Sequence, residues 1–411
     1  MFCNRYLAGG VAAILSASAL TACSHDADVV RVKPVDPLFT SYVSIGNSIT
    51  AGYQSAGIND STQRQSYAVL FAQAVNTPFR IALLNKPGCP PPIDNFNTQH
   101  RVGGGTDGSC ALREPARTPG SLNNVAVPGA TSLSPTGAVP GPDTLVENAL
   151  TTFILGGETQ VQRAAEAQPT FLSVWIGNND VLNASLSGIL PATPGISNGV
   201  TSIDQFTTNY KALVKSIKAI PSIKGGVLIG VINTTNVPLL FPAQVLYNPA
   251  AKGAFDAAAG TATTVDPTTC PPTTTVLLNF QLAGAIRAGA HPPTIFCEPL
   301  PSPFAPVGDV YVLDEAEQAA VADTVNQYNA LIAAEADTLG FAFVDPNPAL
   351  VALREGGQIP IFPDLSQPTA AFGNYFTLDG VHPSATAHIA IVNIIIDAVN
   401  SKYGTNIAHV Q

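Results

Sequence analysis

Residues 42–53 read YVSIGNSITAGY, an apolar run that breaks into a glycine, a polar residue and a serine before a second glycine. This pattern predicts a buried strand that delivers Ser48 to a tight turn. In open α/β sheets ligands bind beyond the carboxyl ends of the strands, and flanking glycines let the backbone come close to a substrate. Ser48 is therefore a candidate nucleophile. The alternative is that this serine only caps the helix that follows.

Apolar and amphipathic segments alternate along the rest of the chain. Residues 170–176 and 226–232 are apolar almost throughout, which is typical of strands buried on both faces of a parallel sheet. The clearest helix begins at Asp314, where Glu317 completes a capping-box pattern, and Gly340 can end it. Further strands are predicted at 80–85, 123–126 and 341–344, and further helices at 67–75, 158–168, 206–217 and 385–403. The alternation predicts a mostly parallel sheet covered by helices.

Composition and charge limit the class of protein. The chain has 411 residues, of which 46% are hydrophobic, and this is ample for a packed core. Because the formal net charge is −10 and no run of Lys or Arg offsets it, we expect no nucleic-acid partner. We predict a single domain over residues 39–403 with loop insertions near 87–119 and 236–310, followed by a tail, residues 404–411.

The N-terminal residues predict export. Residues 7–20 are an apolar run too short for a comfortable membrane span, and Leu-Thr-Ala precedes Cys23. This resembles a bacterial lipoprotein signal, which implies a signal peptide over 1–22, an acylated Cys23 and a tether over 23–38. By resemblance to lipoproteins of double-membrane bacteria, Ser24 after the cysteine favours the outer membrane. The alternative is an ordinary secretory signal with a chance cysteine.

Export would place the remaining cysteines in an oxidising compartment. Cys89, Cys110, Cys270 and Cys297 allow three pairings. We expect Cys89 to pair with Cys110 and Cys270 with Cys297, because each bond would close a long loop and contribute roughly 3 kcal/mol in the chain-entropy model. A zinc site fits the spacing poorly, since no Cys-x-x-Cys pair exists and His291 near Cys297 lacks the usual spacing. We expect no metal and no cofactor.

One histidine is well placed to act as a base for Ser48. A serine hydroxyl becomes a good nucleophile only when a base takes its proton and a third group orients that base. Residues 375–383, YFTLDGVHP, place Asp379 three residues before His382 in a turn that a proline ends. On a loop, this spacing lets Asp379 lie behind the imidazole while the far ring nitrogen faces outward. We expect His388 inside the last helix, and the other histidines in terminal segments or in loops without a carboxylate to orient them.

Four motifs resemble, in their order along the chain, those of the SGNH hydrolases, also called the GDSL family of lipases and esterases. They are Gly46-Asn47-Ser48, Asn124 to Gly129 (Asn-x-Ala-x-x-Gly), Gly177 to Asp180 (Gly-x-Asn-Asp) and Asp379 to His382 (Asp-x-x-His). The first and last motifs bracket most of the mature chain. The resemblance implies a flavodoxin-like, three-layer α/β/α sandwich around a mostly parallel, five-stranded sheet.

The resemblance also implies a role for each of five residues. Ser48 would attack an ester carbonyl, His382 would accept its proton and return it to the leaving alcohol, and Asp379 would stabilise the imidazolium. The oxyanion would receive hydrogen bonds from the backbone N–H groups of Ser48 and Gly129 and from the side-chain amide of Asn179. These donors are chemically apt, since glycine permits close approach and an amide donates without titrating.

One residue departs from the family pattern, and one competing motif exists. The family usually has aspartate where this chain has Asn47, but asparagine keeps the shape and the acceptor oxygen, so we expect activity to survive. Residues 195–199 match the Gly-x-Ser-x-Gly elbow of α/β-hydrolases, with Ser197 as nucleophile. That elbow must follow a strand, whereas Pro191 and Pro194 place this serine in a loop.

The sequence thus predicts a carboxylic ester hydrolase, anchored at a membrane and acting on lipid esters or acylated cell-surface glycans. One alternative is an acyltransferase that passes the same acyl group to a hydroxyl instead of water. Another is a surface-binding lipoprotein that has kept the fold and lost activity, although all five candidate positions carry competent residues. We expect the 87–119 and 236–310 segments to wall the pocket, the second as a candidate lid. The sequence predicts neither acyl chain length nor oligomeric state.

Overall fold

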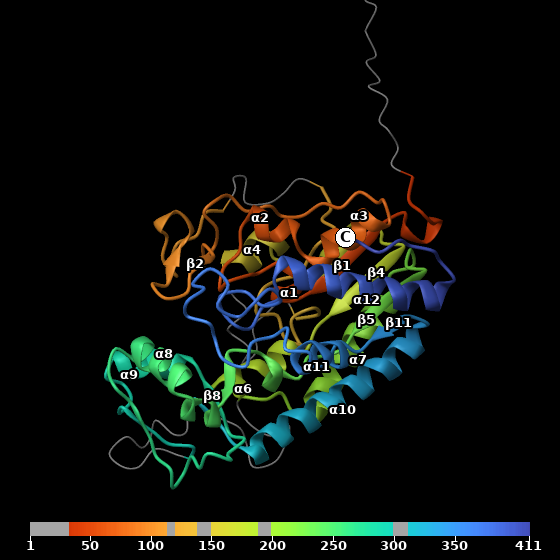
Figure 1. Cartoon of the computed structure of the whole chain (residues 1–411). Helices are drawn as coiled ribbons and strands as arrows, with labels where there is room; N and C mark the ends of the chain where they lie inside the picture. Colours follow the sequence, from red (N-terminus) through yellow and green to blue (C-terminus); the bar gives the residue numbers. More distant parts are fainter. Residues whose placement is uncertain (1–32, 113–119, 138–148, 188–198, 299–310) are drawn as a thin grey trace, which may run out of the picture.

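A four-stranded parallel sheet lies at the centre of the computed structural model, which describes residues 33–112, 120–137, 149–187, 199–298 and 311–411 (Figure 1). The strands lie in the order β1 (Tyr42–Gly46), β4 (Phe171–Trp175), β5 (Gly225–Ile229) and β11 (Ala342–Val344), and each neighbouring pair is parallel. Every residue of β1, β4 and β5 is buried, as expected for strands covered on both faces. The predicted α/β fold with a parallel sheet is confirmed.

The sheet edge beside β1 carries single bridges in place of a fifth full strand. Asn124 forms a parallel bridge with Ser44 and another with Ile81. The Arg80 N–H donates to the side-chain oxygen of Asn123 at 2.9 Å, so a side chain replaces a bond that a regular ladder would make. Within the described residues the sheet therefore has four strands, not the expected five, because these two segments pair at only one position each.

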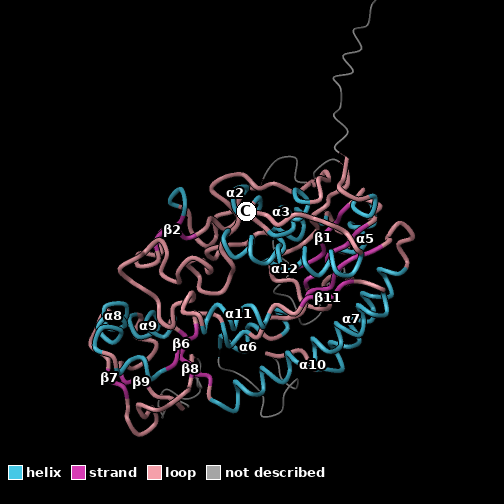
Figure 2. Tube along the Cα trace, turned by 45° about the vertical axis from the view of Figure 1, so that its right-hand side comes forward, coloured by secondary structure: helices cyan, strands magenta, loops and turns pink. Residues whose placement is uncertain are grey.

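Helices cover both faces of the sheet. Val43 and Ile45 of β1 belong to an apolar cluster that includes residues of α5 (Gln160–Glu166), α7 (Ile203–Lys218) and α10 (Glu315–Leu339). Tyr42, which points to the other face, belongs to a cluster with α3 (Tyr67–Ala74) and α12 (Ala385–Tyr403). Figure 2 shows α7 and α10 on one side of the strands and α3 and α12 on the other.

The helix ends match the signals seen in the sequence. The Asp314 side chain accepts from the Glu317 N–H at 2.8 Å, and the Glu317 carboxylate accepts from the Asp314 N–H at 2.8 Å. Gly340 has a φ of 69°, the left-handed conformation that ends α10. The predicted capping box and C-terminal glycine are confirmed. Shorter elements complete this part of the fold: α1 (Ser48–Ala51), α2 (Asp60–Arg64), β2 (Ile93–Asn95), β3 (His100–Arg101), α4 (Ala149–Leu155), α6 (Leu182–Ser187) and α11 (Asn347–Glu355).

Residues 236–298, the described part of the segment expected as the 236–310 insertion, belong to a smaller lobe at the lower left of Figure 1. Its antiparallel sheet has the order β10 (Val312–Leu313), β8 (Leu277–Asn279) and β6 (Leu240–Pro242), accompanied by α8 (Pro249–Ala259), α9 (Gln281–Arg287) and the parallel pair β7 (Thr264–Val265) and β9 (Thr294–Ile295). Its apolar core also includes Phe96, Phe372 and Leu378. The lobe therefore packs against the loop that carries Asp379.

Two disulfides join the cysteines as expected. Cys89 is bonded to Cys110, and Cys270 to Cys297, across 21 and 27 residues of sequence. The sequence-local pairing is confirmed. In the described ranges, no helix has the length and apolar character needed to cross a bilayer. The predicted signal peptide, Cys23 and most of the tether lie outside those ranges.

His388 lies inside α12, as expected, and is fully buried. Its Nδ1 accepts a hydrogen bond from the Tyr67 N–H at 3.2 Å. Burial, with a smaller effect from His382, lowers the pKa of His388 to about 3. The neutral ring is therefore part of the packing between α3 and α12.

Burial of this neutral ring should make the protein less stable in mild acid. An unfolded histidine has a pKa of about 6.5, so this contribution is complete above that pH and is lost as the pH falls towards 3 at about 1.4 kcal/mol per pH unit. Between pH 7 and 5 the native protein should lose about 2 kcal/mol more than His388→Gln in urea unfolding. Equal losses in the two proteins would contradict this assignment.

Candidate active site

The end of β1 delivers Ser48 to the carboxyl edge of the sheet. Asn47 caps α1, since its side-chain oxygen accepts from the Ile49 N–H at 3.1 Å. The acceptor oxygen that asparagine shares with aspartate is thus in use. A Cβ at Gly46 would lie only 2.1 Å from Thr50 Oγ1, so the turn requires glycine there. The structure has the buried strand and tight turn that the sequence predicts.

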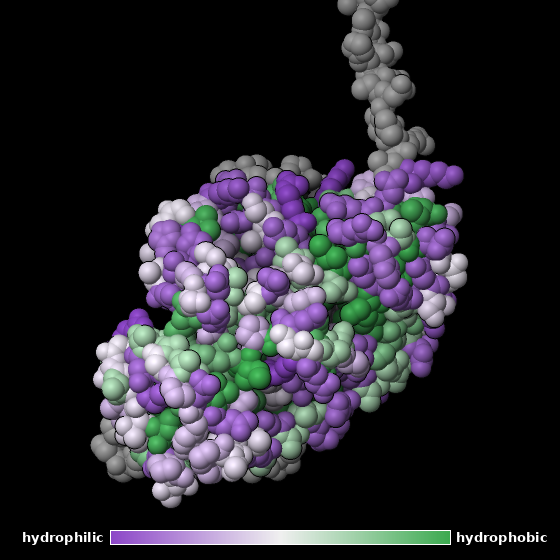
Figure 3. All heavy atoms as spheres, in the orientation of Figure 1, coloured by the Kyte–Doolittle hydropathy of each residue, from purple (hydrophilic) through white to green (hydrophobic). Residues whose placement is uncertain are grey.

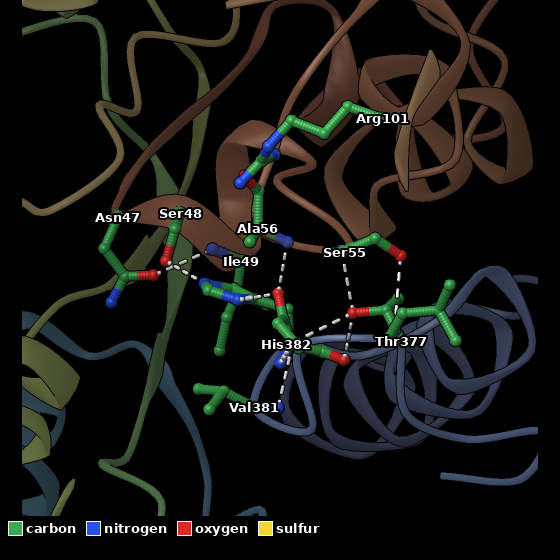
Figure 4. Close-up of polar contacts among 11 residues, drawn as sticks. Asn47, Ser48, Ile49, Ser55, Ala56, Arg101, Thr377, Val381 and His382 are labelled. Carbon is green, nitrogen blue, oxygen red and sulfur yellow. Dashed lines mark hydrogen bonds and ion pairs between the residues drawn. The ribbon is translucent and has the colours of Figure 1, made fainter. Parts of the chain in front are cut away.

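Three predicted residues from distant parts of the chain meet at this edge, and Figure 4 shows two of them, Ser48 and His382, next to each other. His382 Nε2 lies 2.9 Å from Ser48 Oγ, although 334 residues separate them in sequence. His382 Nδ1 lies 2.8 Å from Asp379 Oδ2. In the neutral tautomer that donates from Nδ1 to the carboxylate, Nε2 can accept the serine proton. The arrangement can therefore activate a hydroxyl as a nucleophile.

The Asp379 carboxylate is held by several donors. Its Oδ1 accepts from the N–H groups of Val381 and His382, each at 2.9 Å, and from the Thr377 hydroxyl at 3.0 Å. Its Oδ2 accepts from the Ala56 N–H at 2.7 Å in addition to the imidazole. Burial by itself raises the pKa of Asp379, but the charge of His382 and the hydrogen bonds from His382 and the Val381 N–H outweigh it and lower the pKa well below its usual range. The carboxylate is therefore ionised at neutral pH.

The three predicted oxyanion donors line one pocket with His382. This pocket has a volume of about 370 Å³ and includes Ser48, Gly129 and Asn179 in its wall. Gly129 has a φ of 87°, which favours glycine. Within the described ranges the N–H groups of Ser48 and Gly129 donate to no protein acceptor. The Asn179 amide donates one hydrogen to the Ala130 carbonyl at 2.9 Å, which leaves its second for a ligand.

Asp180 connects two of the motifs, a role that the sequence analysis did not assign. Its carboxylate accepts from the Ser132 N–H at 2.8 Å and from the Ser132 hydroxyl at 2.6 Å, and the residue is buried. Ser132 follows Gly129 closely, so this pair holds the loop of the second motif against the third. The only sequence feature that points to this contact is the acidic residue that ends the Gly-x-Asn-Asp motif, to which no catalytic role is assigned.

The first of the two expected wall segments lines the pocket. Cys89, Pro90 and residues 107–110 form one side of it, so the Cys89–Cys110 disulfide is part of the wall. The smaller lobe instead lines a separate cleft of about 730 Å³, where α9 faces residues 96–101. Figure 3 shows the surface notched between the β2 segment and the lobe that carries α8 and α9. Residues 236–298, the described part of the second expected wall segment, do not line the Ser48 pocket.

The other described histidines lie away from Ser48. His100 Nδ1 lies 2.6 Å from an oxygen of Asp94, so the expectation that no carboxylate orients this ring is wrong. The two residues face each other because β2 and β3 pair in an antiparallel hairpin. His409 contacts Asp397 at the surface, and burial lowers the pKa of His291. In the described ranges, no group of three His, Cys, Asp or Glu residues is arranged to hold a metal ion. Ser197, the serine of the competing motif, and the tether histidine, His25, lie outside those ranges.

Comparison with protein families decides where the chain belongs. The model of the GDSL-like lipase/acylhydrolase family matches residues 42–395, which span β1 to α12 and include the whole site. The chain belongs to this family. The prediction of a carboxylic ester hydrolase is confirmed at the level of the family. No curated protein matches the chain.

The solved structures that match the chain include an esterase and a lipase. One is a catalytic mutant of Axe2, an acetylxylan esterase from Geobacillus stearothermophilus, with 13% identity, a TM-score of 0.37 and coverage of 90% of this chain and 96% of that one. Another is an extracellular lipase from Streptomyces rimosus, with 14% identity, a TM-score of 0.34 and coverage of 87% and 99%. Similarities this weak carry no information about the substrate of this family member.

The pocket wall depends on the Cys89–Cys110 disulfide, so its removal should alter substrate binding as well as stability. Replacing both cysteines by serine should cost roughly 3 kcal/mol in the chain-entropy model and raise KM for an ester substrate. The matched control replaces Cys270 and Cys297, which close a loop of similar length outside the pocket. It should lose similar stability with KM unchanged. A KM that changes equally in both variants would show that the wall is not specific to the first disulfide.

Proposed function

We propose that this GDSL family member hydrolyses carboxylic esters through a covalent acyl-enzyme formed on Ser48. The observation that carries the proposal is the unbroken hydrogen-bonded series from Ser48 Oγ to His382 Nε2, at 2.9 Å, and from His382 Nδ1 to Asp379 Oδ2, at 2.8 Å. The series opens into the pocket that Gly129 and Asn179 also line.

In the first half-reaction, Ser48 Oγ attacks the ester carbonyl while His382 Nε2 takes the hydroxyl proton. The oxyanion that forms accepts hydrogen bonds from the Ser48 and Gly129 N–H groups and the Asn179 amide. Loss of one such donor typically costs about a hundredfold to a thousandfold in turnover. Collapse breaks the bond to the alcohol oxygen, and the imidazolium returns its proton to that oxygen. Asp379 stays ionised and stabilises the imidazolium.

In the second half-reaction, water attacks the acyl-enzyme and gives a proton to His382 Nε2. The second tetrahedral intermediate uses the same three donors, and its collapse breaks the bond between Ser48 Oγ and the acyl carbon. The imidazolium returns its proton to Ser48 Oγ, which restores the hydroxyl and releases the carboxylic acid. A pocket of about 370 Å³ lies in the range of ordinary small-molecule sites. We propose lipid esters or acylated glycans as the substrate class, because the N-terminal sequence is consistent with attachment to a membrane, where such esters occur.

The direct test of the mechanism is the Ser48→Ala variant on a series of nitrophenyl esters of increasing acyl length. Its turnover should fall at least about a thousandfold, since the nucleophile acts as a unit with its base. Ser216→Ala, which removes an exposed hydroxyl on α7, is the control and should keep full activity. An alanine variant at position 48 as fast as the parent protein would eliminate the proposed nucleophile. Products that carry the acyl group on an added alcohol, with little free acid, would instead indicate acyl transfer.

We also propose that Cys23 carries a lipid that anchors the protein at the outer membrane. Support comes from the apolar run at 7–20, the Leu-Thr-Ala before the cysteine and the serine that follows it. In cells, Cys23→Ala should fail to incorporate labelled fatty acid and should move from the membrane fraction to the soluble fraction. Incorporation that persists in this variant, or a native protein that is soluble after cell lysis, would contradict the anchor.

A further inference from the structure

A tight turn at residues 54–57 lies between Ser48 and the loop that carries Asp379. The N–H groups of Gln54 and Gly57 each donate to the other residue's carbonyl oxygen, at 2.8 and 3.1 Å. Ser55 and Ala56 between them both have a φ of 53°. This left-handed conformation costs a residue with a Cβ roughly 1 kcal/mol or more. The turn therefore persists only because its surroundings hold it.

Three hydrogen bonds join this turn to the Asp379 loop (Figure 4). The Ser55 N–H donates to Thr377 Oγ1 at 2.9 Å, and the Leu378 N–H donates to Ser55 Oγ at 3.2 Å. The Ala56 N–H donates to Asp379 Oδ2 at 2.7 Å. The strained backbone thus points its donors at the carboxylate and at the hydroxyl beside it.

The Ala56 donor differs from the others that reach Asp379. Among the described residues, it is the one donor to this carboxylate from outside residues 377–382. It binds Oδ2, the same oxygen that accepts from His382 Nδ1. Bonds within the loop would move with the loop, whereas Ala56 fixes the oxygen relative to the segment that carries Ser48. Its position therefore sets how the carboxylate meets the imidazole.

Arg101 holds the turn from its other side. One guanidinium nitrogen donates to the Ala56 carbonyl at 2.8 Å and to the Pro91 carbonyl at 2.5 Å, and the other pairs with Asp107. The Arg101 side chain is only 10% exposed. A second contact also holds the turn, since the Ile93 N–H donates to the Ser55 carbonyl at 2.8 Å. A guanidinium with several fixed donors suits this task, because it can bind two carbonyls and a carboxylate at once.

We propose that Arg101 is a positioning residue for ester hydrolysis, which holds the strained Ser55–Ala56 turn so that the Ala56 N–H keeps Asp379 aligned with His382. The inference rests on the proposed function. Arg101 has no hydrogen bond to Ser48, His382 or Asp379, so it acts through the turn. Without it, the Ala56 carbonyl loses its charged partner and the turn can relax towards negative φ, which moves the donor away from the carboxylate.

The test is the pH–rate profile of Arg101→Met. A misplacement of about 1 Å caused by a mutation away from the chemistry can cost about a hundredfold, so a smaller displacement of the carboxylate should lower kcat by about tenfold. A misaligned carboxylate stabilises the imidazolium less, so the acid limb of the kcat profile should move to lower pH by about half a unit or more. Loss of the Arg101 cation also frees Asp107, which lies in the pocket wall with His382, and by charge alone this would move the limb to higher pH. A downward shift therefore reports the alignment of Asp379, and an upward shift would overturn the inference.

Arg163→Met is the matched control. Arg163 is also buried, pairs with a carboxylate, Glu166, and donates to a carbonyl, that of Gly120, but it does not contact the turn. Its replacement should lower stability without moving the acid limb. If both variants lose activity in proportion to stability and keep the native acid limb, Arg101 is merely structural and the inference fails. If the native protein hydrolyses no ester, or Ser48→Ala is fully active, the proposed function itself fails.

A second pair of variants keeps the inference testable should Arg101→Met not fold. Thr377→Val removes the hydroxyl that accepts from the Ser55 N–H and donates to Asp379, and Thr377→Ser retains it. The valine variant should show the same downward shift of the acid limb, and the serine variant should restore the native profile. A shift in both, or in neither, would show that the contact between the turn and the loop does not orient the triad.

Discussion

The parallel pairing of β1 with β4 is the constraint on which the site depends. Residues Tyr42 to Gly46 pair in register with Phe171 to Trp175, and both strands are buried over their whole length. Parallel strands end at the same sheet edge, so the turn with Ser48 and the turn with Asn179 emerge side by side. Helices pack on both faces of the strands, which stabilises the pairing and leaves this edge open to a ligand.

The other candidate catalytic side chains, His382 and Asp379, reach that edge on a loop, and a loop must be held in place by contacts outside regular secondary structure. The Thr377 to His382 loop is held from within by its own N–H groups and from without by the Ser55–Ala56 turn. The loop with Gly129 is held by Asp180, and the pocket wall by a disulfide. In each case a buried charge, a cross-link or a strained turn replaces the regular ladder that fixes a strand. These contacts can make an irregular site rigid enough for the preorganised oxyanion pocket that we propose.

Much of the fold followed from local patterns. Asp314, Glu317 and Gly340 marked the ends of α10, and continuous apolar runs marked β4 and β5, because capping and burial act over a few residues. The edge segments at Ile81 and Asn124 were harder to predict from the sequence. Their composition is typical of strands, and it does not reveal that the Asn123 side chain replaces a backbone hydrogen bond of the ladder. The smaller lobe was also underestimated, because strands of two or three residues carry no periodicity.

The sequence by itself determined which side chains could do the chemistry: a serine after a buried strand, an aspartate three residues before a histidine, and an asparagine and a glycine in short motifs. Spacing along the chain is local, and these signals needed only local information. Tertiary structure alone decided that Ala56 donates to Asp379, that Arg101 holds the turn and that Asp180 binds Ser132. Those contacts join residues separated by tens to hundreds of positions, and each of them uses a backbone N–H or carbonyl group, which the residue type does not specify. Only the tertiary structure determines which of these groups come together, and for this reason no sequence pattern predicted the contacts.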